Sequence, residues 1–240
     1  MARRVKPEEY AARRREILVA ALQLLHDKGY AAMTIEDLLA AVQISKGALY
    51  HYFRSKQELL EGVVEHLGES PTVELQRIVD APDRTALDKL HAYFAASHTW
   101  KTENPIAVAT LARLWHDENN ALLRQKMTQG SLRTTAPLLE AIIRQGCAEG
   151  VFDTGFPHEA AGIITAMGMH LADAFIEALQ ADGADGVDIS GPHARRAVAA
   201  YQQAIERILG LADGSLASVA ATTPISDFAA PSARACPPLP

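Results

Sequence analysis

Apolar side chains recur at helical spacing along most of this chain, in segments that are separated by turn-forming residues. In residues 8–28 the recurring positions include Ile17, Leu24 and Leu25, and Gly29 follows them. Apolar residues three and four apart form one face of a helix, and glycine often follows a helix end because it accepts a left-handed backbone. The pattern therefore predicts a first amphipathic helix over about residues 8–28.

Three more helices are predicted after this one, and each begins at a hydroxyl residue. Thr34, Ser45 and Ser55 stand where a side-chain oxygen can accept a hydrogen bond from a free amide of the first helical turn. Asp37 follows Thr34 by three residues, and Glu58 follows Ser55 in the same way, which predicts a full capping box at Ser55. Two short helices joined by a tight turn, with another packed behind, form the helix-turn-helix arrangement.

The helix after Ser45 is unusual because of the side chains that it exposes. Leu49 and Phe53 are four residues apart and are expected to face the core. The rest of the helix carries groups that donate to phosphate or contact base edges, and small residues that let the backbone approach a groove. Packing of its two tyrosines against neighbouring helices is the alternative, but the flanking caps and basic residues favour DNA recognition. The residues left outside are Lys46, Gly47, Ala48, Tyr50, His51 and Tyr52.

The segment SKGALYHYF, which starts at Ser45, and the SK and ELL sequences within residues 55–60 resemble the DNA-binding signature of the tetracycline-repressor (TetR) family. The resemblance covers about residues 14–64. It implies an all-helical bacterial repressor that forms homodimers and carries a variable ligand-binding domain behind its DNA-binding head. By position, it implies that Lys46, Gly47, Ala48, Tyr50 and His51 approach bases or nearby backbone, that Thr34, Tyr52 and Lys56 contact phosphate, and that Ser45 belongs to the same surface.

Charge is distributed unevenly along the 240 residues, whose net charge is −6. Residues 1–56 contain ten Lys or Arg and six Asp or Glu, a net charge of +4, so the remainder of the chain carries −10. A basic head on an acidic body is expected when only one end of a protein meets phosphate. The charge pattern therefore supports DNA binding by the N-terminal part.

Composition excludes several other classes of protein. The two cysteines, Cys147 and Cys236, are too few for a disulfide framework, and a reducing cytoplasm is expected. No run approaches the roughly 20 apolar residues that span a bilayer, so no membrane partner is predicted. The common hydrolase, zinc-protease and phosphate-loop motifs are missing from the sequence, which argues against an enzyme.

The predicted fold is all-α with two domains and a tail. Residues 1–55 form an N-terminal arm and a three-helix helix-turn-helix DNA-binding domain. Residues 56–212 form a helical ligand-binding and dimerisation domain, whose connecting helix over residues 56–68 should break or kink at Ser70 and Pro71 because proline disfavours a continuing helix. Residues 213–240, rich in Ala, Ser, Thr and Pro, are expected to be disordered.

Within the second domain, helices are predicted over about 84–101, from Pro105, after Asn120 through Met127, from Ser131 to Gly150, over about 157–181 and over about 192–211, with a linker at 183–191 between the last two. The helix over 157–181 is apolar on more than one face, and its small residues would allow close helix contact. We expect the last two helices to form a homodimer interface; a helix buried inside a monomer is the alternative. The candidate interface residues are Ala160, Ile164, Gly168, Leu171, Tyr201, Ile205 and Ile208.

Aromatic, methionine and polar residues of the middle helices are candidates for an effector cavity. Most buried aromatic and methionine side chains are plain core, but the implied fold usually holds its inducer in a central cavity. His91 and His98 are seven residues apart, yet no Cys, Asp or Glu completes a tetrahedral set, so neither a metal nor another cofactor is predicted. The expected ligand is a small, largely apolar organic molecule. The candidate residues are Tyr93, Phe94, His98, Trp100, Trp115, His116, Met127, Met167, His170 and Phe175.

These patterns together predict a ligand-responsive, dimeric transcriptional repressor. Two recognition helices would enter successive major grooves, about 34–36 Å apart, on a near-palindromic operator. A small-molecule effector would release the DNA by favouring a different spacing of the two heads, transmitted through the connecting helix. A transcriptional activator of the same fold and a helical carrier or scaffold without DNA binding are the alternatives.

Overall fold

The computed structural model of the chain describes residues 7–116, 121–182 and 192–217. These residues form helices and contain no strand, so the predicted all-α fold is confirmed. Within the described ranges no helix is both long and apolar enough to cross a membrane. The helices are α1 (Pro7–Ala32), α2 (Ile35–Val42), α3 (Lys46–Tyr52), α4 (Lys56–Asp80), α5 (Ala86–Glu103), α6 (Pro105–His116), α7 (Ala121–Thr134), α8 (Ala136–Glu149), α9 (Pro157–Asp182) and α10 (Pro192–Leu209).

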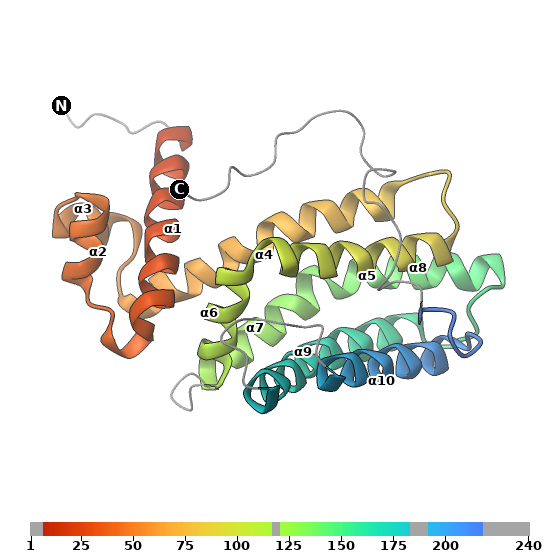
Figure 1. Cartoon of the computed structure of the whole chain (residues 1–240). Helices are drawn as coiled ribbons and strands as arrows, with labels where there is room; N and C mark the ends of the chain where they lie inside the picture. Colours follow the sequence, from red (N-terminus) through yellow and green to blue (C-terminus); the bar gives the residue numbers. More distant parts are fainter. Residues whose placement is uncertain (1–6, 117–120, 183–191, 218–240) are drawn as a thin grey trace.

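The first three helices form a compact head at one end of the molecule, and α5 to α10 form the body at the other end (Figure 1). The long helix α4 runs from the head along the body and belongs to both. In α1, Gly29 leaves the helical conformation with φ 76° and ψ 165°, so the regular helix ends where the sequence predicts. Glycine tolerates this positive φ because it has no Cβ.

Hydroxyl caps define the starts of the next helices. The Thr34 hydroxyl accepts from the Asp37 amide at 3.1 Å, and the Asp37 carboxylate accepts from the Thr34 amide at 2.9 Å, which completes a capping box for α2. The Ser45 hydroxyl accepts from the Ala48 amide at 3.2 Å and caps α3. Between them, Gln43 adopts a left-handed backbone with φ 51°, which turns the chain from α2 into α3.

Of the two hydrogen bonds that the sequence predicts for the capping box of α4, one is formed. The Ser55 hydroxyl accepts from the Glu58 amide at 3.0 Å, as expected. The Glu58 carboxylate, however, accepts from the Arg54 amide at 2.6 Å instead of the Ser55 amide. The predicted full capping box is therefore wrong in its second half, although both carboxylate and hydroxyl still satisfy backbone donors near the helix start.

The predicted break at Pro71 is wrong, because α4 continues through it to Asp80. A proline inside a helix removes one backbone hydrogen bond and costs about 3 kcal/mol. Beyond it, Leu75 and Ile78 are buried in the body, and their burial outweighs that cost. The Thr72 hydroxyl also donates to the Gly68 carbonyl oxygen at 2.7 Å in the same turn.

Two boundaries in the body differ from the sequence-based expectation. Helix α7 continues to Thr134 and α8 begins at Ala136, so Ser131 lies inside a helix and does not start one. Residues 213–217, expected to be disordered, fold back on α10 because the buried Glu206 carboxylate accepts from the Gly214 and Leu216 amides at 3.1 and 2.7 Å. The predicted linker at 183–191 and the tail after residue 217 lie outside the described residues.

Buried side chains form two separate cores. The head-side core contains the apolar faces of α1 to α3 and Leu59, Leu60 and Val63 of α4, together with Leu114 of α6 and Leu123 of α7. The body core joins the second half of α4 to α5, α8, α9 and α10. The packing boundary therefore crosses α4. Helix α6 packs against α1, and α7, which packs mainly on α8 and α9, reaches the head-side core through Leu123.

Candidate nucleic-acid interface

Helix α3 is held from behind by two buried residues. Leu49 and Phe53 are 1% and 3% exposed, and both lie in the head-side core, as their spacing predicts. Gly62 of α4 lies directly behind Phe53, where an added Cβ would come within 2.9 Å of the phenyl ring. The Arg14 guanidinium carbon lies 5.2 Å from the centre of that ring. These contacts fix which face of α3 points outward.

The outward face of α3 carries most of the residues predicted to bind DNA. Lys46, Gly47, Tyr50 and His51 are exposed, and Tyr50 is exceptional among the large apolar side chains of the head in being 44% exposed. Ala48 lies half-buried beside them. The structure thus brings a lysine, a tyrosine and a histidine onto one side of a single short helix, backed by glycine and alanine.

Tyr52 behaves differently from Tyr50, because it packs against the first helix. Its ring stacks on the ring of Tyr10 with centroids 4.7 Å apart and an interplanar angle of 26°. Packing of the tyrosines was the alternative to DNA contact in the sequence, and it holds for Tyr52 while its half-buried side chain keeps some exposure. Tyr10 itself was missed, although its spacing from Arg14 and Ile17 places it on the inner face of α1.

The two basic residues near α3, Lys46 and Lys56, differ in the contacts that they make within the protein. The Lys46 ammonium lies 3.7 Å from the Glu36 carboxylate, and both side chains are well exposed, so this pair is weak and easily exchanged for a phosphate. The Lys56 ammonium donates to the Tyr30 carbonyl oxygen and lies 4.5 Å from the centre of the Tyr30 ring. Lys56 therefore holds the start of α4 against the end of α1. The Thr34 and Ser45 hydroxyls act as helix caps at the edge of the same surface.

Charged side chains at the surface of the head, Arg13, Lys28 and Asp37, also hold α2 in place. Arg13 donates to the Val42 carbonyl oxygen at 3.0 Å, where the negative end of the α2 dipole favours a cation. On the other side of α2, the Lys28 ammonium donates to Asp37 at 2.6 Å. This bond, with the amide and hydroxyl of Thr34, lowers the pKa of Asp37 to about 2. The orientation of α2 and α3 on α1 is thus fixed by charged groups as well as by the core.

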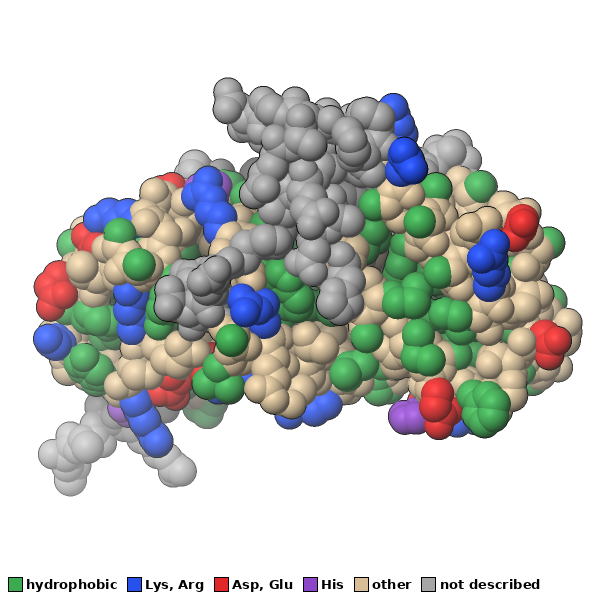
Figure 2. All heavy atoms as spheres, turned by 90° about the horizontal axis from the view of Figure 1, so that it is seen from below, with side chains coloured by type: hydrophobic (Ala, Val, Ile, Leu, Met, Phe, Trp, Pro, Cys, Tyr) green, Lys and Arg blue, Asp and Glu red, His purple; other side chains and the backbone are tan. Residues whose placement is uncertain are grey.

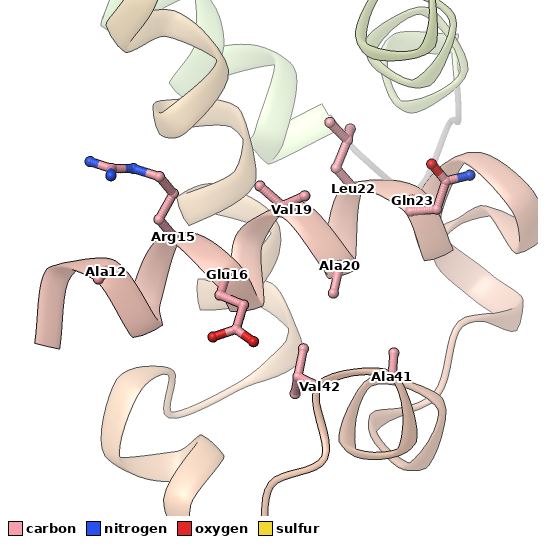
Figure 3. Close-up of a pocket in the computed structure, with 9 residues that line it drawn as sticks. All are labelled: Ala12, Arg15, Glu16, Val19, Ala20, Leu22, Gln23, Ala41 and Val42. Atoms are coloured by element: carbon pink, nitrogen blue, oxygen red, sulfur yellow. The ribbon is translucent and has the colours of Figure 1, made fainter. Parts of the chain in front are cut away.

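An open hollow of about 550 Å³ lies between α1 and α2 on the head (Figure 3). Ala20 of α1 faces Ala41 and Val42 of α2 across it, while Arg15 and Gln23 point away at its rim. None of the residues predicted to bind DNA or effector lines this hollow. It is a shallow surface feature of the helix crossing.

The predicted effector residues do not come together in one place. Tyr93 is buried in the body core with Phe94 packed against that core, and the Phe94 ring lies 6.1 Å from the Tyr201 ring. Burial raises the pKa of the Tyr93 hydroxyl far above its ordinary value. Trp100 and Met127 instead pack against the head-side core. Of the remaining candidates, His98 is exposed, Trp115 and Met167 are half-buried, and the side chains of His116, His170 and Phe175 lie outside the described residues.

Several predicted dimer residues are used inside the protomer. Ala160, Ile164 and Ile205 are buried in the body core, where they join α9 to α10. The Tyr201 hydroxyl donates to the Ile164 carbonyl oxygen at 3.0 Å and lies against Gly168, whose missing side chain leaves it room. Side chains buried in this way cannot also meet a second protomer. Leu171 and Ile208 are half-buried.

Other positions on the same two helices are exposed and apolar or small. Ile163 of α9 is 52% exposed, and Phe156, just before α9, is 71% exposed. Ala199, Ala200 and Gln203 form an exposed strip on α10. Figure 2 shows hydrophobic side chains gathered on this side of the body. We call these five residues the α9–α10 face.

Comparisons with known proteins agree with this arrangement. The family model described as "Bacterial regulatory proteins, tetR family" matches residues 17–63, which include α2, α3 and the start of α4. The transcriptional repressor KstR2 of Mycolicibacterium smegmatis is 34% identical over 91 residues, which are 38% of this chain and 44% of that protein. The nucleoid occlusion factor SlmA of Vibrio campbellii is 27% identical over 139 residues, which are 58% of this chain and 70% of that protein. The chain thus spans less than half of the first relative and more than two thirds of the second.

The likeness to solved structures extends over the body. The structure of SmeT, the repressor of the Stenotrophomonas maltophilia multidrug efflux pump SmeDEF, aligns with a TM-score of 0.64 and 21% identity. The alignment covers 84% of this chain and 92% of that chain. At this identity the likeness concerns the fold, which comprises an N-terminal helix-turn-helix unit and a helical domain behind it.

Proposed function

This chain belongs to the TetR family of bacterial regulatory proteins, and we propose that it acts as a homodimeric repressor that binds a near-palindromic DNA operator and is released by a small organic effector. The observation that carries the proposal is the outward face of α3, where Lys46, Tyr50 and His51 are exposed on a helix whose other side is fixed in the core. Such a face can offer a cation to phosphate and ring groups to base edges. The protein would act in the bacterial cytoplasm, where the chromosome lies.

Dimer formation is proposed through the α9–α10 face. The exposed Ile163 of α9, the exposed Phe156 just before it and two exposed alanines of α10 leave apolar surface that a second copy can cover. The same face on both protomers makes a two-fold interface, and two-fold symmetry of the protein matches an inverted repeat in DNA. One head alone would contact half as many phosphates and bind weakly.

The two cores suggest how an effector in the body could move the head. Helix α4 contributes Leu59 and Leu60 to the head-side core and Ile78 to the body core, and Pro71 lies between these groups. Because Pro71 has no backbone N–H, one helical hydrogen bond is missing, and α4 bends most easily at this turn. A molecule that binds among the body helices would tilt α4 and change the spacing between heads.

A second contact between body and head passes through α6. Arg113 donates to the His26 carbonyl oxygen of α1 at 2.7 Å, and the Thr110 hydroxyl lies 3.4 Å from His26 Nδ1.

The largely apolar surroundings of Tyr93 and Phe94 support an effector of low polarity with few hydrogen-bonding groups. The effector can shift the equilibrium only if it binds the released state more tightly than the DNA-bound state.

The proposal is tested by selecting bound duplexes from a random DNA library. The full chain should enrich an inverted repeat, and a Lys46→Ala, Tyr50→Ala double variant should lose that enrichment. A matched control is the Val73→Ala, Arg77→Ala double variant, because those residues are also exposed, also four apart on one helix, and lie far from α3. The control should select the same repeat as the unchanged protein.

Failure of the unchanged protein to enrich any sequence at moderate salt would contradict DNA reading and favour a helical carrier or scaffold. Equal loss in the head variant and the control would contradict the role of α3. Whether the bound protein represses or activates depends on where the operator lies relative to a promoter, and a reporter placed behind the selected repeat distinguishes the two.

A further inference from the structure

Three aromatic rings meet at the junction of α1 and α3. The Tyr10 ring of α1 stacks on Tyr52, and it also meets the His51 ring edge-to-face with centroids 5.8 Å apart and an interplanar angle of 86°. The His51 and Tyr52 rings are themselves 5.6 Å apart at 79°. His51 thus packs against a stacked pair of tyrosine rings, one from its own helix and one from α1.

His51 has no other specific partner among the described residues, because no hydrogen bond or ion pair of its side chain is formed there. An exposed side chain without such contacts ordinarily samples several rotamers. Aromatic contacts prefer the stacked and edge-to-face arrangements seen here, so the two tyrosines restrict the orientation of the imidazole. Both imidazole nitrogens remain available to donors or acceptors outside the protein.

We propose that Tyr10 is a positioning residue for DNA sequence recognition, which orients His51 toward one base edge through the ring contacts at the α1–α3 junction. The inference rests on the proposed function and adds a residue outside the helix-turn-helix to its specificity. A base contact depends on both distance and angle, so a side chain held in one orientation discriminates bases better than one that rotates freely.

Tyr10 lies on a stretch of α1 that is fixed to the other two helices of the head. One turn further along α1, Arg14 lies over the Phe53 ring, and Arg13 donates to the Val42 carbonyl oxygen. These contacts tie the same stretch of α1 to the ends of α3 and α2. The Tyr10 ring therefore keeps its place relative to α3 when the head moves as a unit.

The test compares affinities for the selected operator and for its single-base variants. Replacing the ring in Tyr10→Leu should lower discrimination roughly two- to tenfold at the positions that also lose discrimination in His51→Ala. Affinity for unrelated DNA and the salt dependence should stay as in the unchanged protein. Tyr10→Phe, which keeps the ring, should keep the discrimination.

A double variant gives the readout that a merely structural role would not produce. If Tyr10 acts through His51, adding Tyr10→Leu to His51→Ala should cause no further loss at those positions. Thermal unfolding checks that each head is folded, and Tyr10→Met, which keeps apolar volume without a ring, repeats the comparison if Tyr10→Leu lowers the unfolding temperature.

A uniform loss of affinity for all duplexes, or an equal effect of Tyr10→Leu with and without His51, would overturn the positioning role. Unchanged discrimination in folded Tyr10→Leu and Tyr10→Met would overturn it as well, while leaving DNA reading by α3 in place. If the unchanged protein binds all duplexes equally, both the proposed function and the positioning role of Tyr10 are contradicted.

Discussion

At the scale of single residues, the head depends on polar groups that each serve a backbone amide or carbonyl. Asp37 is the most engaged of them, since it accepts from the Lys28 ammonium at 2.6 Å and from the Thr34 amide at 2.9 Å. Hydrogen bonds to the charged form of a carboxylate lower its pKa. The value of about 2 for Asp37 follows from these contacts, led by Lys28.

This lowered pKa predicts a pH dependence of stability. A carboxyl whose pKa falls on folding stabilises the folded state above its unfolded pKa, near 3.8, and loses that contribution as the pH falls through its folded value, about 2. Asp37→Asn should therefore lower the thermal unfolding temperature at pH 7, and the difference from the unchanged protein should shrink between about pH 4 and pH 2.

Thermal unfolding followed by circular dichroism over this pH range checks the prediction. Glu36→Gln serves as the control, because Glu36 is the neighbouring exposed carboxylate and has only a 3.7 Å ion pair with Lys46. A difference for Asp37→Asn that stays constant down to pH 2, or one no larger than that of the control, would show that the Asp37 contacts do not stabilise the head.

At the scale of helices, Gly62 sets how closely α4 approaches the end of α3. An alanine Cβ there would come within 2.9 Å of Phe53, 3.1 Å of Leu18 and 3.2 Å of Arg14. Overpacking of a close-packed core typically costs about 1–3 kcal/mol. Gly62→Ala is expected to lower the free energy of unfolding by about that amount, in spite of the better helix propensity of alanine.

Denaturant unfolding measures this change, and Gly130→Ala is its matched control. Gly130 also lies inside a helix, α7, but an added Cβ there meets nothing within 4 Å. The control should gain up to about 1 kcal/mol because alanine replaces glycine in a helix. Similar effects of the two substitutions would mean that Phe53 adapts and that α3 is less firmly held than its contacts indicate.

The helix level also shows what the sequence could and could not predict. The starts of α2 and α3 were predictable because Thr34 and Ser45 act on amides three residues away. The continuation of α4 through Pro71 was not, because it depends on burial of Leu75 and Ile78 against helices distant in sequence. Local signals identify caps and turns, whereas tertiary packing decides whether an unfavourable residue ends a helix.

In the candidate site, too, some features follow from the local sequence and others depend on tertiary packing. Exposure of Tyr50 and His51 followed from the inward spacing of Leu49 and Phe53 on one helix. The stacking of Tyr52 on Tyr10 joins two helices and could be read from no local pattern. For the dimer residues, apolar periodicity marked the helices but did not distinguish the side buried within the protomer from the side left exposed.

At the scale of the whole molecule, the α9–α10 face predicts the oligomeric state. Ile163→Lys places a charge within the proposed interface, where burying it without a partner is costly. Sedimentation equilibrium should show a dimer for the unchanged protein and at least a tenfold weaker self-association for the variant. Operator binding should weaken with it, because both heads are needed.

Val73→Lys is the control for this substitution, since Val73 is 56% exposed and lies on α4 away from the α9–α10 face. It should leave self-association unchanged. A monomeric unchanged protein, or equal weakening by both lysines, would contradict the proposed interface.

The molecule is divided into two cores that share the helix α4. Leu114 of α6 and Leu123 of α7 join the head-side core, so this core extends beyond residues 1–55, the predicted DNA-binding domain. The boundary at residue 55 remains a proposal about function, since the packing boundary lies within α4. Movement between the two cores would carry α6 along with α1, to which Arg113 is bonded.

If α3 meets DNA with Lys46 at the phosphates, the salt dependence of operator binding depends on this lysine. Affinity for the selected operator is measured across salt concentrations for the unchanged protein, Lys46→Ala and Arg77→Ala. The control is matched because each basic side chain is exposed and pairs with a glutamate, Glu36 or Glu74. The slope of log affinity against log salt counts the phosphates that are neutralised.

We expect Lys46→Ala to reduce the magnitude of this slope by about one for each protomer, and Arg77→Ala to leave it unchanged. Identical slopes for the unchanged protein and Lys46→Ala would contradict the account, since α3 would then not present its lysine to the DNA backbone.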